Sequence, residues 1–471
     1  MPEDNVLGTP PQVLDLLEKR LEDRRGRTAR YEAYYAGQHR LSFATSRFRE
    51  AFGNLFSAFA DNWCQLVVDA SVERLHVTGF RFGDEQQGDD EAWRIWQAND
   101  LDGASMLAHT EAVKCGESYL LVSPNDEDPD VPLITVEHPS QVIVAHAPGM
   151  RRVRLAALKK WQGDDKHVYA TLYLPNTVYR FRSREPVRGD LASRIEWVTR
   201  DEAQNNPLGR VPVVPLYNEP SLLGGGMSDL AGVIPLQDAC NKLISDMLVA
   251  SEFAAFRQRW ATGIETPRDP ETGEALPGKD FLSSVARVWN VEDPEAKFGD
   301  FEVTDLGNYV KAIEMIVQHV AAQTRTPPHY LLGQSGAFPS GESLKSTETG
   351  LVAKVQRKQV SFSDGYEEAI RLAFLLKGDE RRGRAFDAET LWKDPESRTE
   401  GEHVDAVLKM ASIGVPQEAL WERLGASPQE IGRWKDMQTG EAARLGMAGI
   451  ADLFKPPVPQ PAQLNGSAQN S

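Results

Sequence analysis

Cysteine is scarce in this sequence. The 471 residues contain only Cys64, Cys115 and Cys240, which lie far apart and include no C-x-x-C pair. An odd number of cysteines without metal-ligand spacing supports neither a disulfide framework nor a zinc site. We therefore expect three small, buried thiols in a reducing, cytoplasmic setting.

Long apolar runs are also missing. No stretch approaches the roughly 18 apolar residues that a membrane-spanning helix needs, and the N-terminus lacks a basic segment followed by an apolar one. That combination would mark a secretory signal. The sequence predicts no membrane partner.

Positive charge is in deficit, because the formal net charge is −17. Tight binding of duplex DNA depends mainly on Lys and Arg side chains that neutralise phosphates. We expect any contact with double-stranded DNA to be weak and insensitive to base sequence. Such a chain is compatible with a channel through which DNA must slide.

Motifs of catalysis are missing as well. The triplet 224–226 is all glycine but lacks the lysine and hydroxyl residue of a P-loop, which favours a hinge. The segment 333–336 falls one residue short of a nucleophile elbow. The acidic turn at 124–130 lacks the ligand spacing of a calcium loop. We predict no catalytic residue, no metal site and no cofactor.

Helical periodicity opens the chain, with amphipathic segments predicted at 11–36, from Phe48 to Arg74 and from Glu91 to about Lys114. The first of these carries an arginine run that could suggest nucleic acid. Interleaved acidic residues favour a solvated helix with ion pairs instead.

From Glu117 to about Asn218 the hydrophobic period changes to two and turn residues recur. This pattern predicts an antiparallel β meander. The expected strands cover 118–122, 133–137, 141–145, 153–160, 168–173, 178–183, 195–199 and 211–217.

Two long helices with wide apolar faces follow, at 235–258 and 305–325. They carry more apolar surface than two helices can hide from each other, which predicts an interface between subunits. The candidate interface residues are Leu243, Met247, Ile313 and Val317.

The segment between these helices contains two β-like runs, at 286–291 and 301–304. After the second helix, Pro327 and Pro328 predict a stop. A loop to residue 340 leads into a third long helix, in which Gly350 and Gly365 predict a bend or break.

The C-terminal part is predicted to contain short helices at 400–413, 416–424, 427–437 and 440–453. Ser427 and Glu430 form a capping-box pattern at the start of the third of these.

Three short stretches resemble the portal proteins of tailed bacteriophages, of the type found in siphophages of Gram-positive bacteria. They are I-P-L-Q-D-A-C-N-K-L-I at 234–244, P-P-H-Y-L-L-G at 327–333 and S-G-E-S-L-K at 340–345. Their order and spacing are similar to those of the family, and the resemblance covers roughly residues 30 to 377.

The resemblance implies an α+β portal fold with a helical and β-meander wing, a two-helix stem, a small clip, a tunnel loop, a long kinked helix and a helical crown. The implied boundaries are wing 1–227, first stem helix 228–258, clip 259–304, second stem helix 305–325, tunnel loop 326–340, long kinked helix 341–377, crown 378–455 and disordered tail 456–471. The family places the tunnel loop beside DNA in the channel. The residues proposed for this contact are Gln334, Ser335, Gly336 and Phe338.

The implied function is a ring of twelve copies at one capsid vertex, the channel for packaging and ejection of DNA. The implied partners are a terminase, a head-to-tail adaptor, the major capsid protein and a scaffolding protein. Assembly in the host cytoplasm and a place in the virion follow. Two alternatives stay open, a metal-dependent nucleic-acid-processing enzyme and another head-to-tail adaptor ring.

Overall fold

The computed structural model describes residues 7–38, 61–83, 88–187, 195–255, 259–262, 271–272, 295–300, 305–332, 341–396 and 400–453. The chain divides into two compact units. One combines Met1–His76 with Ile95–Arg384, and the other combines Val77–Arg94 with Ala385–Ser471. Helices and strands both contribute to each unit, in agreement with the predicted α+β class.

Helix α1, Pro10–Tyr35, opens the first unit and confirms the first predicted helix. Proline fits the first turn because it has no amide hydrogen to leave unpaired. The Gln12 side chain accepts hydrogen bonds from the backbone nitrogen and the hydroxyl of Thr9, at 2.9 and 3.0 Å. The apolar face of α1 packs against a β-sheet through four buried residues, Val13, Leu14, Leu17 and Leu21.

Helix α3, Trp63–Val72, lies within the second predicted helical segment, whose residues 48–60 are outside the described part of the chain. The single helix predicted from Glu91 to Lys114 is wrong. It forms two helices, α4 (Asp90–Ala98) and α5 (Leu101–Cys115), separated at Asp100, whose φ of 52° is left-handed. Asn99 fixes this break because its side chain bonds the carbonyl of Pro132 and the amide of Ile134, both at 2.9 Å.

The predicted strands are present, but the single meander is wrong, because the strands form two antiparallel sheets. The smaller sheet has the order β10-β2-β3, built from Val213–Tyr217, Glu117–Ser123 and Leu133–Glu137. The larger sheet runs β4-β5-β6-β7-β8, with Val142–Ala147, Met150–Gln162, Val168–Tyr173, Thr177–Ser183 and Trp197–Thr199; β9 (Gln204–Asn205) pairs with β7. The last strand of the region thus returns to β2 instead of extending the meander.

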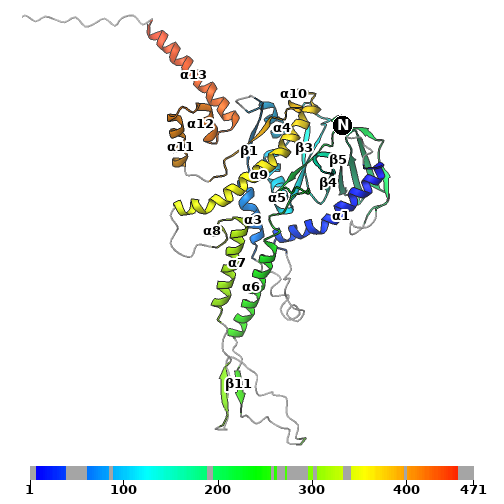
Figure 1. Ribbon diagram of the computed structural model, residues 1–471, viewed down its shortest axis with the longest axis vertical. Helices are drawn as coiled ribbons and strands as arrows, with labels where there is room; N and C mark the ends of the chain where they lie inside the picture. Colours follow the sequence, from blue (N-terminus) through cyan, green and yellow to red (C-terminus); the bar gives the residue numbers. More distant parts are fainter. Residues whose placement is uncertain are drawn as a thin grey trace, which may run out of the picture. The chain divides into compact units, whose positions relative to one another are not determined.

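Helices cover the sheets. Helix α1 packs against β4 and β5 of the larger sheet, while α5 and α9 pack against β2 and β10 of the smaller one (Figure 1). A second apolar cluster joins the two sheets, formed by Tyr119, Leu121, Val142, Ala157, Val211 and Val213.

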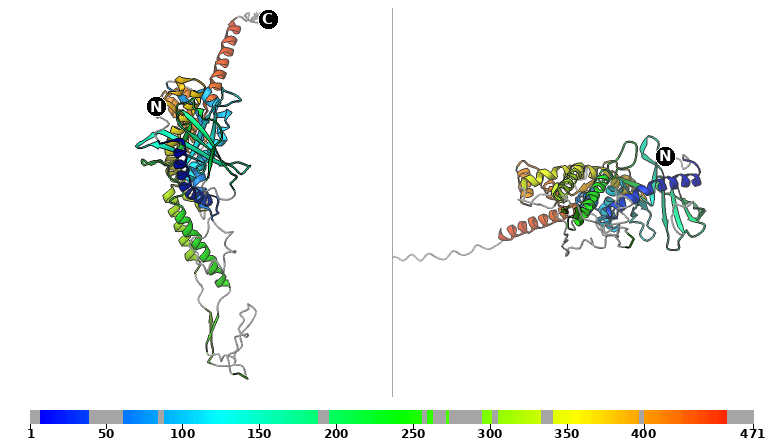
Figure 2. Two further views of the ribbon diagram at one scale, coloured as in Figure 1. Left: turned by 90° about the vertical axis from the view of Figure 1, so that its right-hand side faces the viewer. Right: turned by 90° about the horizontal axis from the view of Figure 1, so that it is seen from below.

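Helices α6 (Ile234–Ala255) and α7 (Gly307–Thr324) form a pair of long helices, here called the arm. They lie side by side and run in opposite directions in both views (Figures 1 and 2). Their bounds confirm the two predicted long helices to within three residues at each end. Strands β11 (Arg259–Thr262) and β12 (Lys297–Asp300) pair with each other. The strands predicted at 286–291 and 301–304 lie outside the described residues.

After α7, the short helix α8 (Pro328–Leu331) begins directly behind Pro327, as the predicted stop requires. Helix α9 then runs from Gly341 to Leu376 and is followed by α10 (Glu380–Gly383). Of the predicted bend or break, the break does not occur, because α9 is continuous through both glycines. Gly365 serves close packing, since an added Cβ would overlap Leu216 and lie 3.2 Å from the carbonyl oxygen of Pro215 on β10.

In the second unit, strand β1 (Val77–Phe82) pairs antiparallel with β13 (Ala388–Trp392), a strand that the sequence pattern did not predict. Three helices follow, α11 (Glu400–Ser412), α12 (Gln417–Arg423) and α13 (Pro428–Leu453). The predicted boundary between 437 and 440 is wrong, because α13 continues through it. A single glycine costs only about 1 kcal/mol in a helix. The capping box is confirmed, with the Ser427 amide 2.9 Å from Glu430 and the Glu430 amide 3.3 Å from Ser427 Oγ.

Candidate functional site

The arm holds the predicted interface residues. Leu243 and Met247 on α6 and Ile313 on α7 are partly exposed, whereas Val317 on α7 is only 1% exposed and packs within the chain. Val310 and Met315 on α7 are 47% and 52% exposed, and the sequence prediction missed both as interface residues. Their apolar side chains within a long predicted helix were the available signal. The arm therefore keeps an apolar surface that its own two helices do not cover.

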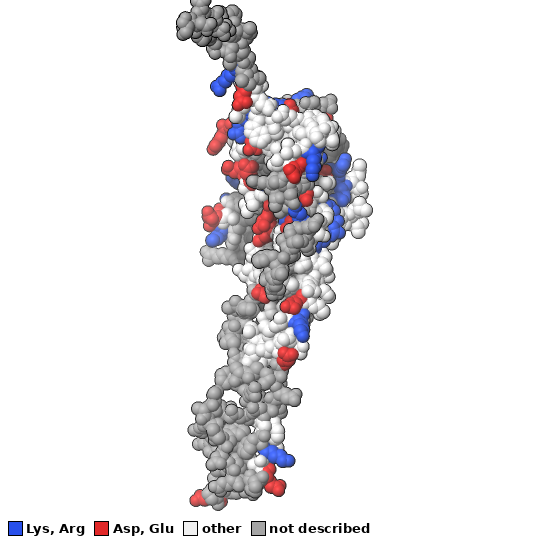
Figure 3. All heavy atoms as spheres, turned by 90° about the vertical axis from the view of Figure 1, so that its left-hand side faces the viewer, with Lys and Arg blue, Asp and Glu red and all other residues white. Residues whose placement is uncertain are grey.

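Charge is sparse on this surface. In Figure 3 the described atoms of the arm that face the viewer are mostly uncharged, with a few acidic and basic groups. Lys311 and Glu314 are the charged side chains along α7. The exposed positions of α7 are mixed, because Asn308, Lys311, Glu314, Gln318 and His319 are polar or charged and Val310 and Met315 are apolar. The two apolar side chains are the ones available for contact with another protein surface.

The four residues predicted for the tunnel loop, Gln334, Ser335, Gly336 and Phe338, lie outside the described residues. The described start of this segment is anchored. Leu331 is buried, and the Tyr330 hydroxyl accepts from Arg74 at 2.8 Å and lies 3.3 Å from Glu348 on α9. Arg74 also pairs with Glu348 at 3.3 Å.

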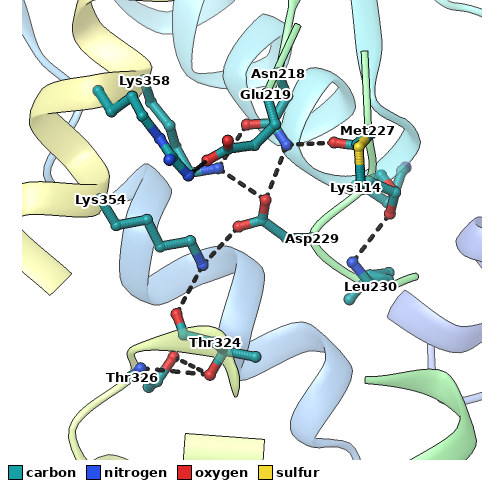
Figure 4. Close-up of polar contacts among 12 residues, drawn as sticks. Lys114, Asn218, Glu219, Met227, Asp229, Leu230, Thr324, Thr326, Lys354 and Lys358 are labelled. Atoms are coloured by element: carbon teal, nitrogen blue, oxygen red, sulfur yellow. Dashed lines mark hydrogen bonds and ion pairs between the residues drawn. The ribbon is translucent and has the colours of Figure 1, made fainter. Parts of the chain in front are cut away.

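A buried polar network lies where the arm meets the first unit's body (Figure 4). Asp229, five residues before α6, pairs with Lys354 at 2.7 Å and with Lys358 at 2.8 Å, both from α9. Lys354 also donates to the carbonyl of Thr324, the last residue of α7, at 3.0 Å. Three segments are thus held by one carboxylate: the approach to α6, the end of α7 and the middle of α9.

Asn218 completes the network. Its side chain donates to Asp229 Oδ1 at 2.9 Å and to the carbonyl of Met227 at 2.6 Å, and accepts from Lys358 at 2.5 Å. The Lys358 side chain is only 1% exposed and that of Asp229 only 4%. Charges buried this deeply are stable only when they are paired and hydrogen-bonded.

Electrostatics agree with the geometry. Burial opposes ionisation of Asp229, but attraction by Lys358 and Lys354 outweighs it and lowers the pKa of Asp229 to about 2. Burial also lowers the pKa of Lys358, an effect that Asp229 partly offsets. The sequence analysis missed this role of the two lysines. The spacing of four residues between the two lysines was the available signal, since it places them on one helix face.

A second polar cluster joins α1, α5 and the turn after β3. His138 Nε2 lies 2.6 Å from Glu32 and 3.0 Å from Glu111, and Lys114 lies 2.8 Å from Glu111. Burial disfavours the charged imidazole, but the hydrogen bonds to Glu111 and Glu32 outweigh burial and raise the pKa of His138 to about 9.

Among the described residues, Glu32, Glu111 and Cys115 bring three metal-ligand atoms within 4.8 Å of one another. The fit to a metal ion is poor. Both carboxylates already face cationic partners, and burial with the nearby Glu111 raises the pKa of the Cys115 thiol, which keeps it protonated. The three cysteines are all buried and free, as the sequence analysis expected.

None of the helices in the described parts of the chain is both long enough and apolar enough to cross a bilayer.

Comparison with known proteins identifies the class of protein that this fold represents. Residues 14–443 match the model of the family described as "Phage portal protein, SPP1 Gp6-like", and the chain belongs to this family. The portal protein of Mycobacterium phage D29 is 33% identical over 419 residues, covering 84% of this chain and 82% of the relative. The portal protein of Mycobacterium phage L5 is 33% identical over 420 residues, with the same coverage.

These findings confirm the resemblance and do not favour the nucleic-acid-processing alternative. Because the chain belongs to this family, it is a phage portal protein. The family is structural, and its members are components of the capsid.

Proposed function

We propose that twelve copies of this chain form a ring at one capsid vertex and that double-stranded DNA passes through its central channel during packaging and ejection. The observation that carries the proposal is the arm. Its exposed apolar residues need a partner surface, and the buried Asp229 network fixes the arm's base to the rest of the first unit. The expectation of a ring comes from membership in the portal family.

In this assignment, α6 and α7 are the stem, the segment with β11 and β12 is the clip, and residues 326–340 are the tunnel loop. Residues 1–227 and α9 form the wing, and residues 378–455 form the crown. Neighbouring stems meet through Leu243, Met247 and Ile313, joined by the exposed Val310 and Met315. Val317 is buried within the chain and is not available to a neighbouring stem.

The proposed partners follow from the same assignment. They are a terminase, a head-to-tail adaptor, the major capsid protein and a scaffolding protein, with assembly in the host cytoplasm. DNA contact is weak and independent of sequence, because the chain carries a net charge of −17. In the channel, this contact is assigned to Gln334, Ser335, Gly336 and Phe338.

The experiment is negative-stain electron microscopy of the purified protein, combined with sedimentation to count subunits. We expect rings with a central hole. A monomer at every concentration tested would overturn the proposal. Deleting residues 334–337 then tests the tunnel loop, with rings retained and less DNA packaged per head. Normal packaging by that variant would remove the loop from the DNA path.

A further inference from the structure

A groove of about 440 Å³ opens on the first unit between α1, β2, β4 and β10. Three arginines of α1 line it, Arg20, Arg24 and Arg27, spaced by four and three residues on one helix face. Tyr119, His146 and Tyr217 line the opposite side. Burial, with Arg154 and Arg151 nearby, lowers the pKa of His146 to about 4, so this residue is neutral near pH 7.

The arginines differ in how they are used. Arg24 is buried and hydrogen-bonded to Glu117, to the Tyr119 hydroxyl at 2.7 Å and to two backbone carbonyls. Arg20 and Arg27 are exposed and have no ion pair among the described residues. The groove therefore offers two exposed guanidinium groups that make no ion pair within the described part of the chain, with Asp23 as the acidic residue of α1 beside them.

Two acidic residues of α1 that were expected to pair with its arginine run do not pair with Arg20 or Arg27. Glu18 accepts from Lys160 at 2.7 Å and from the Trp197 indole at 2.9 Å, and Glu22 pairs with Arg25 at 3.0 Å. Only Asp23 of α1 lines the groove as an acid. The sequence-based picture of a helix with self-compensated charges does not hold on this face.

A tight turn borders the groove at Gly225 and presents two leucines to solvent. Leu222 is 92% exposed and Leu223 is 100% exposed. The Ser221 amide donates to the Gly225 carbonyl at 3.0 Å, and the Gly224 amide donates to the Ser221 carbonyl at 3.1 Å.

The glycines after the leucines hold the turn in place. Gly224 and Gly225 have φ of 103° and 69°, which other residues adopt at a cost. A Cβ on Gly226 would overlap the carbonyl oxygen of Gly116 and lie 2.6 Å from that of Asn218. Gly226 therefore serves close packing, and the predicted hinge at 224–226 stays a prediction. Burying a leucine side chain contributes about 1.5–3 kcal/mol of favourable free energy. Leu222 and Leu223 do not gain this free energy in the isolated chain.

A complementary surface lies at the other end of β2. The loop after Ser123 exposes Asp126, Glu127 and Asp128, and none of the three pairs with a Lys or Arg among the described residues. Strand β2 spans seven residues, roughly 20 Å, so the loop and the groove beside Glu117 face away from each other along the strand. Each chain therefore carries the arginine groove near one end of β2 and the acidic loop at the other end of the same strand.

We infer that the acidic loop of one subunit docks into the arginine groove of the next subunit, with Leu222 and Leu223 buried beside it. This inference rests on the proposed ring. A closed ring needs a head-to-tail interface that joins two different surfaces of the same chain, and the groove and the loop are such a pair. The charges set orientation and reject wrong pairings, while the leucines supply apolar area.

The test is a charge exchange. The groove variant is Arg20→Glu with Arg27→Glu, and the loop variant is Asp126→Lys with Asp128→Lys. Each variant alone brings like charges together, so the subunit concentration at half-assembly should rise at least about tenfold. An equimolar mixture of the two variants should form rings again, because every groove then has a loop of opposite charge. Sedimentation and microscopy read the outcome.

The matched control is Lys19→Glu with Lys166→Glu, which changes the net charge equally at exposed positions outside the groove and should assemble normally. Assembly of the groove variant at the control's concentration would overturn the inference, as would a mixture that fails to restore rings. If the groove variant loses DNA binding but keeps its rings, the groove serves DNA and the inference is wrong.

Circular dichroism checks that each variant is folded. If the charge variants unfold, the exposed pair Leu222→Ser with Leu223→Ser carries the test, and unchanged assembly of that variant overturns the inference. Wild-type protein that forms no ring at all would instead contradict the proposed function.

Discussion

Asp229 faces two lysine ammonium groups in a site that is almost closed to water. The excess positive charge is stabilised by oxygen dipoles. Lys354 donates to the carbonyl of Thr324, at the C-terminal end of α7, where the helix dipole is negative, and Lys358 donates to Asn218. The carboxylate and these oxygens together make two buried lysines tolerable.

Replacing this carboxylate is the first prediction. Asp229→Asn keeps the shape of the side chain but leaves two buried cations without a counter-charge, so we expect the free energy of unfolding to fall by about 3–5 kcal/mol. Urea unfolding at one protein concentration measures it. The double variant Asp229→Asn with Lys358→Met should recover part of the loss. Equal stability of the single variant and the wild type would show that the network contributes little.

His138 gives the second prediction, a pH dependence. Its pKa rises to about 9 in the folded chain, above the ordinary value of 6.5. The folded state therefore holds the proton more tightly, and the stabilisation is complete below pH 6.5 and lost as the pH rises through 9. Allowing for solvent screening, the contribution is about 2 kcal/mol.

The measurement compares melting temperatures of wild type and His138→Gln from pH 6 to pH 9.5. The wild-type value should fall across this range, and the variant's value should change less because it lacks the titrating group. Parallel curves would mean that His138 does not carry the pH dependence.

At the scale of elements, helix α9 shows how one residue type has opposite effects along a helix. Gly365 sits against β10, where a Cβ would overlap Leu216 and press on the Pro215 carbonyl. At Gly350, an added Cβ would make only an ordinary contact, 3.5 Å from the Cβ of Arg325. Alanine favours the helix over glycine by about 1 kcal/mol wherever it fits.

The third prediction is therefore a matched pair. Gly350→Ala should raise the free energy of unfolding by up to about 1 kcal/mol, whereas Gly365→Ala should lower it by about 1–2 kcal/mol because α9 must move away from β10. Denaturant titration of both variants and the wild type measures the three free energies of unfolding. Stabilisation by both would show that β10 yields to the new methyl group without cost.

The same elements show what the sequence could predict. Apolar periodicity located α1, α6, α7 and nearly every strand of the two sheets, because period is a local property. It missed the turn at Asp100, which depends on the contact of Asn99 with β3. It also missed the pairing of β1 with β13, since partners hundreds of residues apart leave no local pattern.

The site was harder to predict for a related reason. Lysine is rarely buried, so nothing in the local sequence marks Lys354 and Lys358 as buried partners of Asp229, which lies far away in the sequence. The arm's apolar stripe predicts an interface, but not which side of the arm would face a partner. Val317 is buried and Met315 is exposed, a difference that depends on how α7 packs in the chain and that periodicity alone does not fix.

At the scale of the whole molecule, the chain must remain soluble as a subunit and still associate into a closed ring. Its net charge of −17 favours the first requirement through mutual repulsion. The second requires local surfaces strong enough to overcome that repulsion. In the proposed ring, the arm supplies apolar area for this association, and the groove and the acidic loop set its direction.

The last prediction separates the surface of the arm from its interior. Val310→Asp with Met315→Asp places charges on exposed positions of α7, so the subunit should stay folded while ring formation is lost. Val317→Asp places a charge at a buried position of α7 and should lower the subunit's own melting temperature, because an unpaired charge is costly where water is excluded. Leu243→Asp, on the partly exposed face of α6, should resemble the surface pair. Size-exclusion chromatography and thermal melts of the three variants test the distinction. Intact rings from the surface pair would show that the stems do not form the subunit interface.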